Sequence, residues 1–268
     1  MNVLISADME GTCGITDWSE TERSTPQDYS YFQQQMSREA AAACEGALAG
    51  GADGLLVRDA HDSARNLNPL MLPRQARVLR GWSGDPLSMV SGLDRERFDA
   101  VLFTGYHAWA ASPGSPLAHT MNTRNEYVLL NGTRMSEFQL NAYTAGYYGA
   151  RVPFLSGDKE LCDFARTLIP DIVTVPVNEG RGGAVLSMHP DEAVAQIRAG
   201  AEEAVRRADR CPVRLPDRFE AVVRFQTHET AFHRSFYPGA GLEDGKCVLF
   251  SCDDWFEMLR FFHFVLSA

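Results

Sequence analysis

The chain has 268 residues, of which 45% are hydrophobic and 22% are charged, a balance typical of globular proteins rather than of disordered or fibrous ones. Its formal net charge of −10 argues against a nucleic-acid partner, because such a partner favours a basic protein surface. The sequence has no secretory signal pattern and no apolar run of the ~20 residues that a membrane helix needs, so we expect a cytoplasmic protein that does not bind membranes.

Patterns of strands and helices alternate along most of the chain. Short apolar runs predict buried strands, and longer stretches with helical periodicity that stop at glycine or proline predict helices. In chain order, we expect a strand at residues 3–7, a helix at 26–50, strands at 53–58, 76–82 and 98–106, a hairpin at 127–135, a helix at 136–149, a strand at 152–156, a helix at 158–169, a strand at 172–177 and a helix at 189–209. This alternation predicts an α/β fold with a largely parallel central sheet flanked by helices.

Two further features concern how the chain is organised. Residues 110–125 show no periodicity, and a long segment of this kind inside a compact domain is often functional. A boundary is expected at residues 211–216. Residues 1–210 would then form the α/β core, and residues 211–268 a smaller αβ unit packed on it, with strands at 219–226 and 246–252 and a final helix.

Acidic and histidine side chains follow several of the predicted strands. Asp8 and Glu10 come after the first strand, and His61 and His107 follow two later ones. Glu137 lies at the start of the helix that follows the hairpin. Because ligand sites in open α/β sheets form at the carboxyl ends of strands, these five residues are candidates for one site.

Each candidate also has a structural explanation when it is taken alone. A strand end can carry solvated acids, a lone histidine is often packed or exposed, and Glu137 could simply interact with the helix dipole. As a set, three carboxylates and two imidazoles are typical of zinc hydrolases. Five ligands exceed what one catalytic zinc ion needs, whereas two ions that share a bridging carboxylate would use them all.

Three other residues are weaker candidates for a place in the site. Asp59 could orient a histidine ligand or cap its own turn, and the sequence supports both equally. Asp158 is expected to be a helix N-cap. Met121 flanks the aperiodic segment, where we expect packing in the core rather than a place in a pocket.

Several segments resemble those of a known family. The segments SADMEG, VRDAH, TGYHA, AHTM and SEFQLNAYTAGYYG are similar to segments of the D-aminopeptidase family of binuclear zinc metallopeptidases, in the same order and at similar spacing up to about residue 160. Beyond Gly180 the resemblance is loose. It implies an α/β fold and removal of N-terminal residues, D-amino acids in particular, from short peptides or amides. It also implies a homo-oligomer, a decameric ring that encloses the active sites.

The resemblance implies a role for each candidate ligand. Asp8 would bridge two zinc ions. Glu10 and His107 would complete the protein ligands of one ion. His61 and Glu137 would complete those of the other.

His119, in the AHTM segment, matches the family histidine that acts as catalytic nucleophile or base. The loop between His107 and His119 is about one residue longer than the family spacing, and the extra residue lies within SPGSPLA. The residues themselves do not distinguish a nucleophile from a base.

Two alternatives stay open at this point. The ligand types alone also fit a binuclear metal amidohydrolase or phosphoesterase that acts on a non-peptide substrate. A non-catalytic oligomeric binding protein could have the same fold. A panel of substrates would separate the first alternative from a peptidase, and weak metal binding would favour the second.

Overall fold

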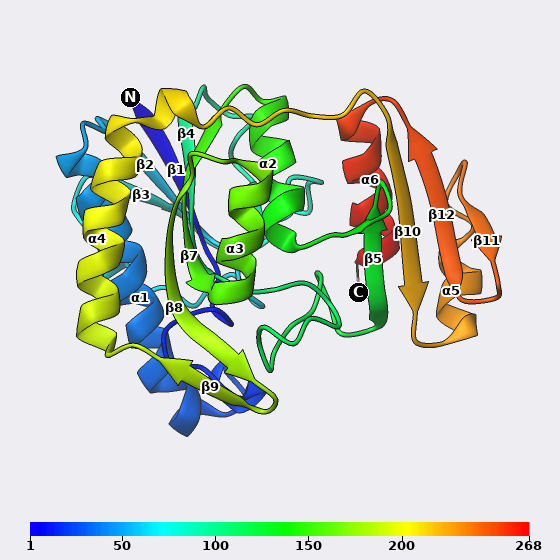
Figure 1. Cartoon of the computed structure of the whole chain (residues 1–268), viewed down its shortest axis with the longest axis horizontal. Coiled ribbons are helices and arrows are strands. Elements are labelled where there is room, and N and C mark those ends of the chain that lie inside the picture. The colour runs from blue at the N-terminus through cyan, green and yellow to red at the C-terminus, as the bar shows by residue number, and fades with distance from the viewer. Residues whose placement is uncertain (268) are drawn as a thin grey trace.

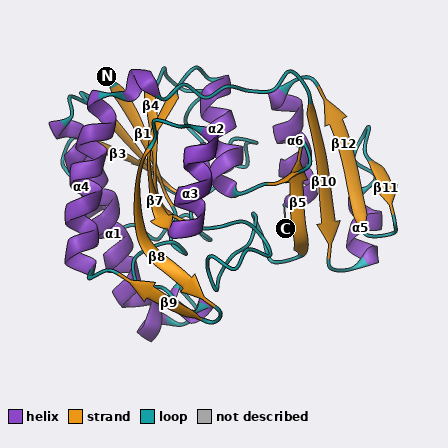
Figure 2. Cartoon of the chain, in the orientation of Figure 1, coloured by secondary structure: helices purple, strands orange, loops and turns teal. Residues whose placement is uncertain are grey.

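A seven-stranded and largely parallel sheet forms the centre of the protein (Figure 2), here described for residues 1–267 of a computed structural model. In order across the sheet, its strands are β3 (Ala76–Leu79), β2 (Gly54–Asp59), β1 (Asn2–Ala7), β4 (Ala100–Tyr106), β7 (Arg151–Asp158), β8 (Val173–Arg181) and β9 (Ala184–Ser187). All neighbouring strands run parallel except β8 and β9, which form an antiparallel hairpin. The predicted α/β fold class is therefore confirmed.

Helices cover both faces of this sheet because its strands are apolar on both faces. Along β4, Ala100 and Leu102 pack into one core while Val101 and Phe103 pack into the other, as expected when successive side chains point to opposite faces. One face is covered by α1 (Pro26–Ala49) and α4 (Pro190–Arg206), and the other by α2 (Glu137–Tyr147) and α3 (Lys159–Leu168) (Figure 1).

Side chains cap the starts of α2 and α3. The Ser136 hydroxyl accepts a hydrogen bond from the Gln139 backbone N–H at 3.1 Å, which satisfies one of the free donors at the start of α2. The Asp158 carboxylate does the same for α3, at 2.8 Å from the Leu161 N–H, so the predicted cap is confirmed. The same carboxylate also accepts from the Ala108 N–H at 2.5 Å, a contact that ties the end of β4 to α3.

A second, antiparallel sheet lies beside the helices of the first. In order, its strands are β11 (Gly241–Glu243), β12 (Cys247–Cys252), β10 (Phe219–Phe225), β5 (Asn125–Leu130) and β6 (Thr133–Arg134). Strands β5 and β6 form the predicted hairpin, and Asn131 and Gly132 at its turn have the positive φ angles that such turns require. Because β5 pairs with β10, this sheet takes strands from both sides of residue 210.

The last helix, α6 (Trp255–Leu266), joins the two parts of the molecule. It lies between α2 and the second sheet (Figure 1), and the Trp255 indole N–H donates to the Thr144 hydroxyl on α2 at 3.2 Å. Its buried aromatic residues form a third core with the strands of that sheet. In the described part of the chain, no helix is both long enough and apolar enough to cross a membrane.

Some short elements carry no signal that the sequence analysis used. They are the strands β9 and β11, the helix α5 (His228–Arg234) and the 3-10 helices at Trp18–Glu20, Pro69–Met71, Ser88–Val90 and Ala208–Arg210. Strand β9 follows the Gly182-Gly183 turn, where the chain reverses so that β9 pairs with β8. Such short segments are held by tertiary pairing rather than by their own periodicity.

We predict that Gly157→Ala lowers the free energy of unfolding by about 1–3 kcal/mol, because a Cβ there would lie 1.9 Å from the Tyr106 carbonyl oxygen and would push β7 away from β4. Urea unfolding would measure this change. The matched control is Gly183→Ala, where no atom lies within 4 Å of the added carbon and the change should be under about 0.5 kcal/mol. Equal losses in the two variants would contradict the prediction.

Candidate metal centre

The candidate ligands meet at the carboxyl edge of the main sheet. Asp8, His61 and His107 follow β1, β2 and β4, and these three strands are neighbours in the order β2-β1-β4. Later strands are added on opposite sides of β1, so the ligands lie at the point where the strand order reverses and where open α/β sheets bind ligands. Glu10 lies in the turn after Asp8, and Glu137 is the first residue of α2.

The distances place these five residues in two groups that share Asp8. His61 Nδ1 lies 3.0 Å from Glu10 Oε2 and 3.6 Å from Asp8 Oδ1. His107 Nε2 lies 3.6 Å from both Asp8 Oδ2 and Glu137 Oε2. Each group offers three ligand atoms within 4.8 Å of one another.

This grouping differs from the pairing that the family resemblance implied. The resemblance placed Glu10 with His107 and His61 with Glu137. The shortest distances join Glu10 to His61 and His107 to Glu137, but Glu10 also forms a group of possible ligand atoms with His107 and His119. The reason is the strand order. His61 and His107 come from strands on opposite sides of β1, so each faces a different oxygen of the central Asp8 carboxylate.

The chemistry of this set fits a pair of divalent cations. Each of the five residues is at most 5% exposed. Within residues 1–267, Asp8 Oδ2, Glu10 Oε2 and His107 Nε2 are buried without a hydrogen-bond partner. A buried carboxylate without a neutralising partner destabilises the folded state by several kcal/mol, on the order of the penalty for any unpaired buried charge. The donor atoms are those that zinc prefers, and cations between them would remove this cost.

Both imidazoles are oriented by backbone carbonyls. His61 Nε2 lies 2.9 Å from the Thr21 carbonyl oxygen, and His107 Nδ1 lies 2.9 Å from the Ala108 carbonyl oxygen. When these nitrogens carry the proton and donate it to the carbonyls, the other nitrogen of each ring directs a lone pair at the carboxylates. This is the usual arrangement of histidine ligands, whose second nitrogen is held by a neighbouring acceptor.

Asp59 acts on the turn that carries His61 rather than on its ring. The Asp59 carboxylate accepts hydrogen bonds from the Asn66 and Leu67 backbone N–H groups at 2.6 and 2.7 Å. The Asn66 side-chain amide in turn donates to the His61 carbonyl oxygen at 2.6 Å. Of the two roles considered for Asp59, the structure therefore favours the capped turn.

The loop between β4 and β5 brings His119 to the same cluster. Its Nε2 lies 3.4 Å from Glu137 Oε1 and 3.8 Å from Glu10 Oε1, and its ring stacks on that of His107 with centroids 4.3 Å apart. Its Nδ1 lies 2.9 Å from the Leu117 carbonyl oxygen, which leaves Nε2 free to face the pocket. The additional residue in this loop thus leaves His119 within reach of the cluster, close enough to Glu10 and His107 to be a ligand itself.

Burial and neighbouring charges act differently on the groups of the cluster. Burial raises the pKa of Asp8 to about 8, and the Glu10 carboxylate beside it adds to the rise. Burial alone would also raise the pKa of Glu10, but the imidazole of His61 brings it well below its ordinary value. Burial lowers the pKa of His119, and His107 lowers it further, so His119 is held as a neutral imidazole. Of the three carboxylates in the cluster, Asp8 is therefore the one whose pKa is raised.

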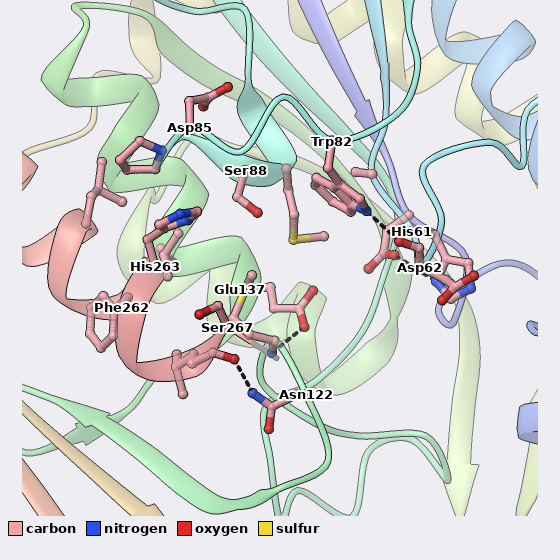
Figure 3. A pocket seen from close by; sticks show the side chains of 18 of the residues that line it. His61, Asp62, Trp82, Asp85, Ser88, Asn122, Glu137, Phe262, His263 and Ser267 are labelled. Carbon is pink, nitrogen blue, oxygen red and sulfur yellow. Dashed lines mark hydrogen bonds and ion pairs between the residues drawn. The ribbon is translucent and has the colours of Figure 1, made fainter. Parts of the chain in front are cut away.

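The cluster opens into a pocket of about 450 Å³ (Figure 3). Trp82 lines it from the loop after β3, and Phe262 and His263 line it from α6. Met121 packs against two of the cores, as expected, and also lines the pocket. No local sequence pattern pointed to these residues, because they come from a loop and from a helix of the other sheet.

Comparisons with known proteins point to one family. A family model described as D-aminopeptidase matches residues 1–264. The D-aminopeptidase of Bacillus subtilis (strain 168) is 32% identical over 262 residues, which cover 96% of this chain and 93% of that protein. A solved structure, described as the Zn-dependent D-aminopeptidase DppA from Bacillus subtilis, a self-compartmentalizing protease, matches with a TM-score of 0.91 and 29% identity, over 100% of this chain and 99% of that one. The chain therefore belongs to the D-aminopeptidase family of peptide hydrolases.

Proposed function

We propose that this chain is a zinc-dependent aminopeptidase that removes the N-terminal residue, a D-amino acid, from short peptides or amino-acid amides. The observation that carries this proposal is the sharing of one buried carboxylate, Asp8, between two groups of zinc-type ligands at the edge of the pocket. The family match supports peptide hydrolysis. Neither a phosphoesterase nor a non-catalytic binding protein has comparable support.

The proposed centre holds two zinc ions per chain. Asp8 would bridge them, with Glu10 and His61 on one side and His107 and Glu137 on the other. When bound, the ions would supply Lewis-acid polarisation of the scissile carbonyl and a more acidic hydrolytic water. The Met121 backbone N–H, which donates to Glu137 Oε1 at 2.7 Å, would hold that carboxylate in place.

His119 is proposed as the catalytic base or nucleophile rather than as a metal ligand. It comes from a loop and not from a strand end, and its lowered pKa favours the neutral ring that either role needs. The Leu117 carbonyl would fix the proton on Nδ1, so that Nε2 could accept a proton or attack the substrate carbonyl. The His119 ring stacks on that of His107 and meets the Trp18 ring edge-on, with the centroids of His119 and Trp18 5.2 Å apart. These contacts would restrict rotation of the His119 ring.

A homo-oligomer, a decameric ring in the cytoplasm, is proposed as the working assembly. The similar solved structure is described as self-compartmentalizing, which fits an enzyme whose copies enclose their active sites. This chain also exposes large apolar side chains, among them Leu186 at 73% and Phe236 at 71%. Contacts between copies would remove such surfaces from water.

The first test of this proposal is metal content. Zinc-replete protein should hold two zinc ions per chain by elemental analysis, and Asp8→Ala should lose both because it removes the shared ligand. His61→Ala and His107→Ala should each lose one. The control is His189→Ala, whose side chain is 74% exposed and which should keep both ions. One ion or none in the wild type would contradict the two-zinc centre.

The second test separates catalysis from metal binding at His119. His119→Ala should keep both zinc ions and its native fold, while kcat falls by at least ~10²-fold, the lower range for losing a positioned acid–base group. Added imidazole should restore part of the activity, since it can occupy the space that the side chain leaves. Loss of zinc in this variant would make His119 a ligand, and normal turnover would remove it from the reaction.

The third test is the mass of the particle in solution. Light scattering should give a mass several times the 29.7 kDa of one chain, with ten copies for the proposed ring. A single-chain mass at working concentration would rule out the assembly without affecting the proposed chemistry.

A further inference from the structure

The pocket beside the metal cluster has two chemically different halves. One half is the cluster itself, with its carboxylates and imidazoles. The other half, here called the apolar wall, consists of Met89, Leu140, Leu259, Phe262 and Leu266. Each of these five side chains is at most 4% exposed, so the wall is part of the packed core and not a loose surface.

The apolar wall begins directly beside the cluster. Leu140 lies three residues after Glu137 on α2, a spacing that puts the two side chains on the same face of the helix. Leu259, Phe262 and Leu266 share one face of α6, at spacings of three and four residues. Figure 3 shows Phe262 and Glu137 around the same cavity. A group bonded to a carbonyl at the cluster would therefore reach this wall first.

Two contacts hold α6 at a fixed place relative to the cluster. The Trp255 indole joins the start of α6 to Thr144 on α2, at 3.2 Å. The Asn122 side-chain amide donates to the Leu266 carbonyl oxygen at 2.6 Å, which joins the end of α6 to the loop that carries His119. The distance between wall and cluster is thus set at both ends of the helix.

The opposite side of the pocket is equally fixed. The buried Arg58 guanidinium donates to the Gly81 and Ser88 carbonyl oxygens at 2.6 and 3.2 Å and lies 4.4 Å from the centre of the Trp82 ring. The Trp82 indole N–H donates to the Asp62 carbonyl oxygen at 2.6 Å, a contact visible in Figure 3. The pocket therefore has a definite width, which is what selection by side-chain shape requires.

The apolar wall offers no partner to a charged side chain. Its leucine, phenylalanine and methionine side chains have no group that could neutralise a charge. Two acids outside the cluster, Asp62 and Asp85, also line the pocket, but neither belongs to the wall. Asp85 accepts hydrogen bonds from the Leu87 N–H at 2.9 Å and the Ser91 hydroxyl at 2.7 Å. An ammonium group placed against this wall would lose its hydration without a matching gain.

We infer that the apolar wall is the specificity pocket for the side chain of the substrate's N-terminal residue, and that it selects apolar side chains of intermediate size such as that of leucine. This inference rests on the proposed function, because it takes the scissile carbonyl to lie at the metal cluster. The N-terminal side chain is separated from that carbonyl by one carbon, so it would lie against the wall residues near Glu137, such as Leu140. The leaving amine would point away, toward the open side of the pocket.

The test compares kcat/KM of the zinc-loaded protein for the amides of D-Ala, D-Leu and D-Lys. The wild type should prefer D-Leu amide to D-Lys amide by about tenfold or more, because the charged side chain loses its hydration. Phe262→Ala should reduce the preference for D-Leu over D-Ala amide by about tenfold, since the wall then loses contact with the larger side chain.

The matched control is Phe261→Ala, an identical truncation one residue earlier. Phe261 is fully buried but packs against Phe250 on β12, with ring centroids 4.7 Å apart, and does not line the pocket. It should lower thermal stability and leave the D-Leu to D-Ala ratio unchanged. A ratio of two kcat/KM values does not depend on the fraction of folded enzyme, so it separates selectivity from stability.

The outcomes distinguish this inference from the proposed function. An active wild type that accepts D-Lys amide as well as D-Leu amide would overturn the inference alone. An unchanged D-Leu to D-Ala ratio in Phe262→Ala, or an equal change in Phe261→Ala, would do the same. A zinc-loaded wild type that hydrolyses none of the three amides would refute the proposed function, and the inference with it.

Discussion

Three carboxylates, from Asp8, Glu10 and Glu137, are buried together at one edge of the main sheet, and their mutual repulsion is the constraint on which the site depends. Without a cation, burial and the neighbouring acid raise the pKa of Asp8 to about 8, so the shared carboxylate tends to be protonated near neutral pH. The imidazoles of His61 and His107 offset part of this repulsion. A pair of divalent ions would neutralise all three groups at once, which is why we assign the cluster to metal binding.

The backbone keeps these groups close although they repel. His61 and His107 are each held by a carbonyl oxygen, which keeps both rings beside the carboxylates. The carbonyl oxygen of Tyr106, directly before His107, is so close to Gly11 and Gly157 that a Cβ on either would lie 1.9 Å from it. Because neither glycine has a Cβ, the turn after β1 and the end of β7 can pack directly against the end of β4. The site therefore uses the rigidity of the parallel sheet to hold an arrangement that is unfavourable without its ligand.

The second sheet supplies the other half of the pocket. Its helix α6 carries three of the five residues of the apolar wall, and its hairpin of β5 and β6 follows directly on the loop that carries His119. The candidate metal ligands thus come from the edge of the main sheet and from α2, whereas most of the apolar wall comes from α6. Because α6 is tied to α2 through Trp255 and Thr144, a change in the packing of the second sheet would reach the pocket through this helix.

The sequence by itself determined the fold class, the order of the main elements and the candidate ligands. Asp8, His61 and His107 each follow an apolar run that local patterns identify as a strand. Parallel strands place their carboxyl ends at the same edge of the sheet, so these residues were expected to lie together. Only the tertiary structure decided which candidate ligands lie closest together, because their grouping depends on the strand order on either side of β1. It also decided that Met121 faces the pocket, and that Trp82 and Phe262 form opposite sides of it. These residues lie far apart in the chain, and no local periodicity encodes a contact between two separate sheets.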